Sequence, residues 1–196
     1  MTSYTFDSTK PVYQSGAEAI KNPVTGDSMV VLQSTQESSG NSFTAKFTLP
    51  PGSHGTPLHY HNNLLETFEV LSGALEMELG EKGNIKVLLP GEVVYVPAGM
   101  YHSFRNPSGN EVVFVSSVHP AGEFEHFIRA MYGLAIDGKV SSSGMPKNLL
   151  HFALIIQKAD LVLAGLPVFI QKLIIGSLAA LGRLLGMERS LSKYWN

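Results

Sequence analysis

The feature that most constrains this chain is a series of short apolar segments between residues 28 and 120, separated by turn signals every few residues. In residues 43–49, apolar side chains alternate with polar ones, which is typical of a strand with one buried face. Pairs such as Ser72-Gly73 and Pro90-Gly91 end the segments. Many short strands joined by turns, without long helical crossovers between them, predict an all-β barrel or sandwich.

The chain divides into four parts by its hydrophobic pattern. We expect an N-terminal arm over 1–27 with one short edge strand, a β-barrel over 28–120, a helix and linker over 121–148, and apolar C-terminal helices over 149–196. A helix is expected at 123–132, and two more at 149–165 and 167–186, broken at Pro167. The expected strands cover residues 29–32, 43–49, 57–61, 67–71, 75–79, 85–88, 93–96, 102–105 and 112–118.

Composition narrows the classes of function. Of 196 residues, 44% are hydrophobic and 15% are charged, which is typical of a folded chain. A net charge of −2 argues against nucleic acid as the partner. The chain has no cysteine, which excludes disulfides, thiolate metal sites and a cysteine nucleophile. No signal peptide is expected from the N-terminal residues, so the cytoplasm is the default location.

The C-terminal part differs in charge from the rest, because residues 149–196 carry five basic and two acidic side chains. We favour packing of its helices on the barrel or in a dimer interface. Peripheral membrane contact through residues 149–186 stays open as an alternative. A bilayer span is disfavoured, because Pro167, Lys172 and Arg183 interrupt the apolar stretch.

Two histidines lie two positions apart in PLHYHNNLLETFEVLSG, residues 57–73. On a strand, the side chains of His59 and His61 leave the same face, which makes them suitable first ligands for a divalent cation. Glu66 begins the next strand and shares a face with Phe68 and Val70. A carboxylate that enters an apolar interior is costly unless it is paired or ligated, and a metal ion would remove that cost.

A third histidine follows a tight turn in GEVVYVPAGMYHSFRN, residues 91–106. Pro97 and Gly99 form the turn, and His102 begins the next strand with Phe104 on the same face. If this strand lies beside the first two histidines, three imidazoles and one carboxylate surround one point. Such a set suits Fe, Mn, Ni, Cu or Zn and leaves coordination positions open.

These two segments resemble the two sequence motifs of the cupin superfamily, as found in small single-domain bacterial cupins. In the first motif, the family's H-x-H, E and G positions are filled, but Ser53 stands where the family has a leading glycine, between Gly52 and Gly55. In the second, every position is filled, namely by Gly91, Pro97, Gly99, His102 and Asn106.

The resemblance covers about residues 28–120 and leaves the arm and the C-terminal helices outside the motifs. It implies a double-stranded β-helix (jelly roll), a divalent metal ion as cofactor, and often a homodimer. The metal ligands that it implies are His59, His61, Glu66 and His102.

Other residues near the motifs are assigned structural roles. The glycines and Pro97 are expected to form turns, and Asn106 to bond a loop backbone. Tyr60 should face outward, and Arg105 should form a surface ion pair. An apolar pocket wall is assigned to six residues, for which simple core filling is the alternative: Phe47, Phe68, Met77, Tyr95, Phe104 and Phe114.

Two classes of function follow from a metal with open positions. The first is a dioxygenase-like oxidoreductase that acts on a small organic acid, diketone or phenolic compound, with Glu66 as a ligand or as the catalytic base. The wider family also contains isomerases and decarboxylases. The second is a non-catalytic sensor or carrier of a metal and a small ligand. The common metalloprotease, P-loop, Rossmann and hydrolase-elbow motifs are absent from the sequence.

Overall fold

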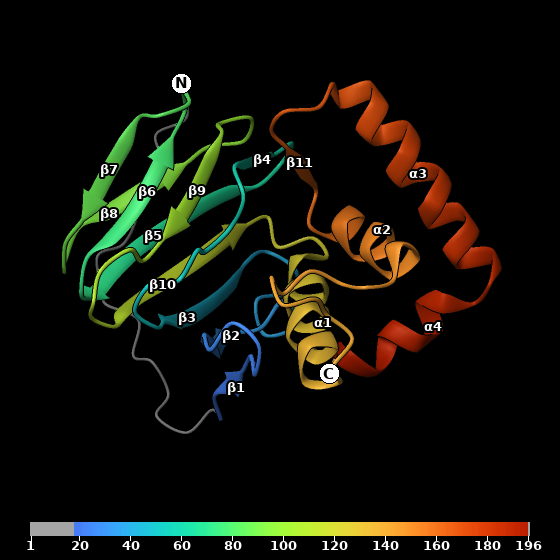
Figure 1. Ribbon diagram of the computed structural model, residues 1–196, viewed down its shortest axis with the longest axis horizontal. Helices are drawn as coiled ribbons and strands as arrows, with labels where there is room; N and C mark the ends of the chain where they lie inside the picture. The colour runs from blue at the N-terminus through green and yellow to red at the C-terminus, as the bar shows by residue number, and fades with distance from the viewer. Residues whose placement is uncertain (1–17, 196) are drawn as a thin grey trace.

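A computed structural model describes residues 18–195 of the chain (Figure 1). Nine strands lie between residues 28 and 120, and each coincides with a strand expected from the sequence. A short edge strand precedes them in the arm, whose residues 1–17 lie outside the described part. The strands in this region are β1 (Ile20–Lys21), β2 (Ser28–Gln33), β3 (Phe43–Leu49), β4 (His59–His61), β5 (Leu65–Ser72), β6 (Leu75–Leu79), β7 (Ile85–Leu88), β8 (Val93–Val96), β9 (His102–Arg105) and β10 (Val112–His119).

The strands form two antiparallel sheets. One has the order β1-β2-β3-β10-β5-β8, and the other has the order β11-β4-β9-β6-β7, where β11 (Leu161–Leu163) comes from the C-terminal part. The two sheets are not joined into a closed ring of hydrogen bonds among the described residues. The all-β architecture expected from the sequence is therefore found as two antiparallel sheets that share a core, and not as a closed barrel.

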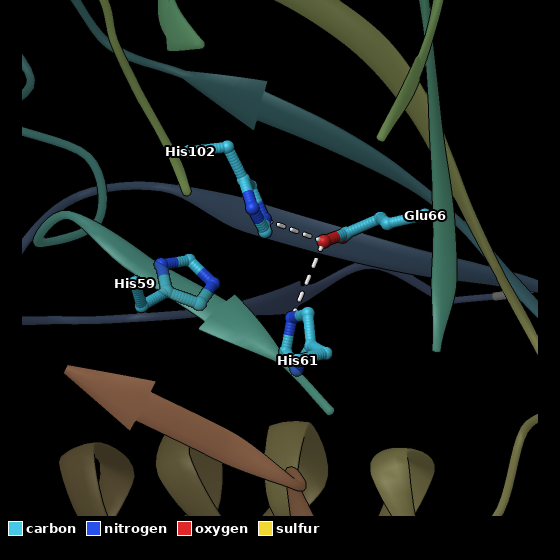
Figure 2. Close-up of side chains that lie close together, drawn as sticks. All are labelled: His59, His61, Glu66 and His102. Atoms are coloured by element: carbon cyan, nitrogen blue, oxygen red, sulfur yellow. Dashed lines mark hydrogen bonds and ion pairs between the residues drawn. The ribbon is translucent and has the colours of Figure 1, made fainter. Parts of the chain in front are cut away.

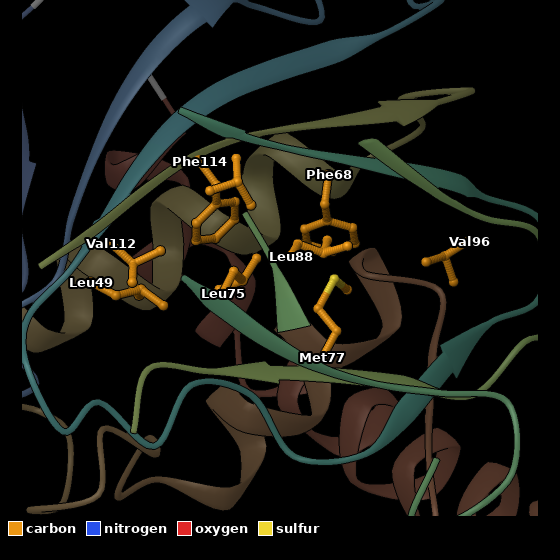
Figure 3. Close-up of a cluster of buried hydrophobic side chains, with 9 residues drawn as sticks. Leu49, Phe68, Leu75, Met77, Leu88, Val96, Val112 and Phe114 are labelled. Carbon is orange, nitrogen blue, oxygen red and sulfur yellow. The ribbon is translucent and has the colours of Figure 1, made fainter. Parts of the chain in front are cut away.

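That core lies between the inner faces of the sheets (Figure 3). Alternate residues of β3, β5 and β10 meet alternate residues of β6, β7 and β9, because successive side chains of a strand point to opposite faces. Phe68, Leu75 and Phe114 are fully buried there. The cluster consists of Leu49, Phe68, Val70, Leu75, Met77, Leu88, Val96, Val112 and Phe114.

Helices cover one end of the two sheets (Figure 1). The helix expected at 123–132 is confirmed and extends further, to Ile136. Asn148 caps the next helix by accepting hydrogen bonds from the two backbone N–H groups of Leu150 and His151. The helices are α1 (Phe124–Ile136), α2 (Leu149–Lys158), α3 (Val168–Leu184), α4 (Met187–Leu191) and the 3-10 turn η1 (Ser192–Tyr194).

The helix expected over 149–165 is wrong in its last part. It ends at Lys158, and Asp160 takes a left-handed backbone conformation with φ of 50°. The chain then runs as β11 antiparallel to β4, with Leu161 opposite His61 and Leu163 opposite His59. The following helix begins directly after Pro167, close to the expected position. The difference arises from a tertiary contact that the local sequence does not encode. Strand β4 would otherwise have an unpaired edge, and this segment pairs with it.

The helical layer is joined to the sheets by packing and by charge. Phe124 and Tyr132 of α1 belong to a buried cluster that also contains Met29, Phe43 and Val118 of the first sheet. Lys158 at the end of α2 is itself buried, and its ammonium lies 2.6 Å from Glu123 Oε1 and 3.3 Å from Glu188 Oε1.

The outer face of α3 exposes several large apolar side chains, Phe169 and Leu173 among them. Over residues 18–195, no single helix is long and apolar enough to cross a bilayer. The helices α3 and α4 with η1 pass that test only together, and they meet at a bend of 88°.

Candidate metal centre

Four candidate ligands converge between the two sheets (Figure 2). His59 and His61 lie on β4, and His102 lies on the neighbouring strand β9, with His59 directly opposite His102 in the register. Glu66 reaches the same point from β5 of the facing sheet. The four residues are between 1% and 6% exposed. One potential ligand atom from each lies within 4.8 Å of the other three.

Each imidazole is oriented by a backbone carbonyl at its Nδ1 atom. The Nδ1 of His59 lies 2.8 Å from the Pro57 oxygen, that of His61 lies 2.8 Å from the Ala159 oxygen, and that of His102 lies 3.2 Å from the Met100 oxygen. A carbonyl only accepts, so each Nδ1 carries the proton in these contacts. The Nε2 atom of each ring is therefore the one that would bind a metal, as in metal-binding histidines.

The carboxylate of Glu66 is held at both oxygens. Its Oε2 lies 3.1 Å from His102 Nε2 and 3.5 Å from His61 Nε2. Its Oε1 accepts a hydrogen bond of 2.8 Å from the Ser116 hydroxyl of β10. Ser116 was not expected at the site. The polar Ser116-Ser117 pair inside the otherwise apolar strand was the available signal for it.

The charges of the cluster are set by burial and by mutual contact. Burial, followed by repulsion from His102 and His61, lowers the pKa of His59 to about 3. Burial alone would raise the pKa of Glu66, but the close contacts of its carboxylate with the His102 and His61 rings outweigh burial and hold that pKa below its usual range. For His61, burial is outweighed by the Glu66 carboxylate, so its pKa is raised. The site therefore contains a neutral imidazole at His59 beside an ionised carboxylate.

These residues fit a divalent metal ion. The Nε2 atom of His61 is buried without a hydrogen-bond partner, which is costly unless a ligand occupies that position. Three imidazole nitrogens and one carboxylate oxygen are borderline ligands that suit Fe, Mn, Ni, Cu or Zn. Among the described residues, this is the cluster whose geometry suits a metal ion.

A cavity of about 590 Å³ adjoins the cluster, and His59, His61 and Glu66 form part of its wall. Of the six residues expected in its apolar wall, Phe47, Phe68, Phe104 and Phe114 line it. Met77 does not, because it packs in the core between the sheets. Tyr95 does not either, because its ring lies on the outer face of β8 and is 53% exposed.

The helical part supplies the rest of the wall, which the sequence did not reveal. The lining residues from this part include Phe124, Phe127, Ile128, Met131 and Tyr132 of α1, Phe152 and Ile156 of α2, and Leu161 and Leu163 of β11.

The segment before β11 also fixes the metal-binding strand. The Asp160 carboxylate accepts hydrogen bonds from the Asn63 backbone N–H at 2.7 Å, from Asn63 Nδ2 at 3.0 Å and from Asn62 Nδ2 at 2.9 Å. Asn62 and Asn63 form the turn between His61 and Glu66. We call these contacts, together with the bond from His61 Nδ1 to the Ala159 oxygen, the Asp160 clasp.

Two residues for which the sequence predicted structural roles, Asn106 and Tyr60, have those roles in the structure. The side-chain amide of Asn106 donates to the carbonyl oxygens of Leu49, Pro50 and Asn110. The ring of Tyr60 packs outside the cluster, edge-on to that of Tyr101.

The same holds for the turn and surface positions of the motifs. Arg105 pairs with Glu76 at the surface. Gly73, Gly91 and Gly99 take positive φ in turns. Near the missing motif glycine, Gly55 meets the Phe104 carbonyl so closely that a Cβ atom would lie 1.7 Å from its oxygen.

Comparison with known proteins finds a family match for part of the two-sheet region. A family model described as a cupin domain matches residues 45–118. No curated protein matches the chain.

Among solved structures, a predicted oxalate decarboxylase from Thermotoga maritima is 24% identical, with 53% of this chain and 90% of that chain covered and a TM-score of 0.45. The polyketide cyclase RemF from Streptomyces resistomycificus is 22% identical, with 57% and 80% covered and a TM-score of 0.48. A sugar phosphate isomerase from Silicibacter pomeroyi is 24% identical, with 49% and 60% covered and a TM-score of 0.42. Residues 45–118 therefore match the cupin domain model, and the matched stretch contains all four candidate metal ligands.

Proposed function

We propose that this protein is a metal-dependent enzyme of the dioxygenase type, with its divalent metal held by the three histidines and Glu66. The observation that carries the proposal is the orientation of the imidazoles. Their Nδ1 atoms are all bound to backbone carbonyls, so their Nε2 atoms face one point at the wall of the cavity. A cavity of about 590 Å³ is of the size that binds small organic molecules.

When bound, the metal supplies Lewis acidity and a template that brings an organic substrate and O2 together. The reaction class that we propose is cleavage of a substrate carbon–carbon bond, in which each new end receives one oxygen atom of O2. The substrate supplies the electrons that reduce O2, so no further reductant is needed.

Glu66 is the candidate catalytic residue in this proposal. Its carboxylate is ionised, and it lies in the wall of the cavity, where it can accept a proton from a substrate hydroxyl. Ser116 holds the Oε1 atom, which leaves Oε2 directed toward the histidines.

The test combines metal analysis with oxygen uptake. The purified 196-residue chain should contain close to one equivalent of a first-row divalent metal. Loaded anaerobically with Fe(II) or Mn(II), it should consume O2 with a diketone or phenolic substrate. The substitution His102→Ala should weaken metal binding by about 100-fold or more, because it removes a ligand rather than an outer partner.

The matched control is His119→Ala, which removes an exposed histidine outside the cluster and should leave metal content and turnover unchanged. Turnover without oxygen uptake would replace the dioxygenase proposal by an isomerase or a decarboxylase. Stoichiometric metal and ligand binding with no turnover for any metal would replace it by the second candidate, a non-catalytic sensor of a small ligand.

A further inference from the structure

The wall of the cavity next to the metal ligands is aromatic. Phe68 lies with its ring centroid 6.0 Å from that of His102. From there the rings continue to Phe104 at 5.8 Å, and from Phe104 to Phe114 at 5.2 Å. Phe47 stacks on Phe114 at 5.4 Å. These four phenylalanines form a continuous surface that begins at the ligand set.

The part of the cavity wall formed by α1 and α2 is also rich in phenylalanine. Phe124 of α1 packs edge-on to His61 with ring centroids 5.7 Å apart, and Phe127 follows at 5.6 Å from Phe124. Phe152 of α2 also lines the cavity. Seven of the ten phenylalanines of the chain therefore lie around this one space, on both sides of the histidines.

The charges of the lining are as informative as its rings. Among the described residues that line the cavity, none is a lysine or an arginine. Its carboxylates are Glu66, at the ligand set, and Asp27, which accepts hydrogen bonds from Tyr132 and Thr25. The other lining groups outside the ligand set are hydroxyls and amides, such as Ser53 and Thr56, and one exposed imidazole, that of His54. An anionic group placed here away from the metal would lose its hydration without gaining a lysine or an arginine as a partner.

We infer that the substrate of this site is an uncharged molecule with an aromatic ring, which reaches the metal through oxygen atoms and carries no phosphate or carboxylate. The inference rests on the proposed function and narrows it. Phenolic compounds and aryl diketones fit this wall, because their rings bury apolar surface and their oxygen atoms lie at one end. Dicarboxylates, sugar acids and phosphorylated sugars do not fit it.

The test uses the 196-residue chain loaded with Co(II), whose visible absorption reports both metal binding and the arrival of an oxygen ligand. Three probes share one chelating group: acetylacetone without a ring, benzoylacetone with a phenyl ring, and benzoylacetone with a carboxylate on that ring. Each affinity is divided by the affinity of the same probe for Co(II) in buffer. We expect the phenyl ring to strengthen binding by about tenfold or more. The added carboxylate should remove that gain.

A pair of lysine variants tests whether the carboxylated probe binds weakly because the cavity wall lacks a lysine or arginine. Met131→Lys places a cation in the cavity wall and should restore binding of the carboxylated probe by about tenfold, while benzoylacetone loses affinity. Ile136→Lys adds the same charge to an exposed position of the same helix, outside the cavity, and should change neither affinity. The ranking of the three probes on the unmodified chain is independent of how well either variant folds.

The outcomes separate the two proposals. If Co(II) is not bound by the four ligands, the proposed function falls and the substrate class falls with it. If Co(II) is bound but the carboxylated probe binds as tightly as benzoylacetone, the metal site stands and the inferred substrate class is overturned. Equal binding of acetylacetone and benzoylacetone would overturn it as well, because the aromatic wall would then contribute nothing.

Discussion

The strand that carries two of the candidate ligands lies between two very different neighbours. On one side of β4 is β9, which follows about forty residues later within the same barrel and brings His102. On the other side is β11, which belongs to the C-terminal part and is reached only after two helices. The barrel supplies the candidate metal ligands, whereas the C-terminal part supplies the carbonyl that orients His61 and one wall of the cavity.

The contrast between these two neighbours of β4 shows that two regions of the chain contribute different parts of one site. Metal ligands must be held accurately, which rigid strands do well. Because alternate side chains of a strand share a face, a short motif such as H-x-H is enough to direct two ligands to the same side. Outer contacts that orient the ligands come from any segment that reaches them, with little local pattern of their own. The C-terminal part is therefore a component of the site, even though it lies outside the cupin motifs.

The largest effect that tests this division is expected from Asp160→Gly. The change removes the side-chain bonds of the Asp160 clasp, while glycine tolerates the left-handed backbone without strain. We expect the metal Kd to rise by about tenfold, because the turn between His61 and Glu66 loses its support. Isothermal titration with Co(II) at one fixed pH measures this change.

Ser39→Gly is the matched control for that experiment. Ser39 is the other described non-glycine residue with a positive φ, at 54°. It lies in a loop outside the cavity wall, so the same backbone relaxation should leave the metal Kd unaltered. An unchanged Kd for the Asp160 variant would mean that the barrel positions His61 by itself.

A smaller effect is expected from Lys158→Met, which cuts the electrostatic link between α2 and its neighbours. The substitution removes the ammonium that contacts Glu123, Glu188 and the ring of Trp195. Because both carboxylates are partly exposed, the free energy of unfolding should fall by only about 1–2 kcal/mol. Chemical denaturation gives this value, and the metal Kd should stay constant. If metal affinity fell as much as in the Asp160 variant, the packing of the whole helical layer, and not only the Asp160 clasp, would be needed to hold the metal ligands.

The smallest effect is expected on the outer surface of the barrel. Arg105→Ala removes the ion pair with Glu76, in which the arginine side chain is 55% exposed. Its stability should change by about 0.5 kcal/mol or less. Arg129→Ala offers the contrast, because the Arg129–Glu125 pair has both side chains at most 18% exposed and should cost more. Equal losses for the two variants would contradict this ranking.

The sequence allowed the strands to be predicted because they depend on short-range spacing, whereas the four-residue cluster was implied by the resemblance to the two cupin motifs. Alternation fixes which face of a strand is buried, and Gly and Pro mark where it ends. The position of Tyr95 could not be predicted in this way, because VVYV over β8 has no alternation. Its register with β5 decides the matter, since Val96 opposite Glu66 points inward and Tyr95 therefore points outward.

The end of α2 was missed for a related reason. Leu161-Val162-Leu163 continues an apolar pattern that suits a helix as well as a strand, and only the free edge of β4 decides between them. The Asp160 clasp joins residues 97 and 98 positions apart, and no spacing rule covers such a distance. Ser116 and the phenylalanines of the helical side are equally nonlocal, because their role depends on which elements meet at the cavity.

The late position of β11 has a consequence for biosynthesis. His61 and the carbonyl that orients it are 98 residues apart. At about 5–20 residues per second, the ribosome needs roughly 5–20 s to add that length, and further residues must then leave the exit tunnel. Throughout this interval the histidine-bearing strand has one open edge. Stable loading with metal is therefore expected only after residues 159–163 have left the ribosome, and a nascent chain stalled before residue 159 should bind the ion weakly.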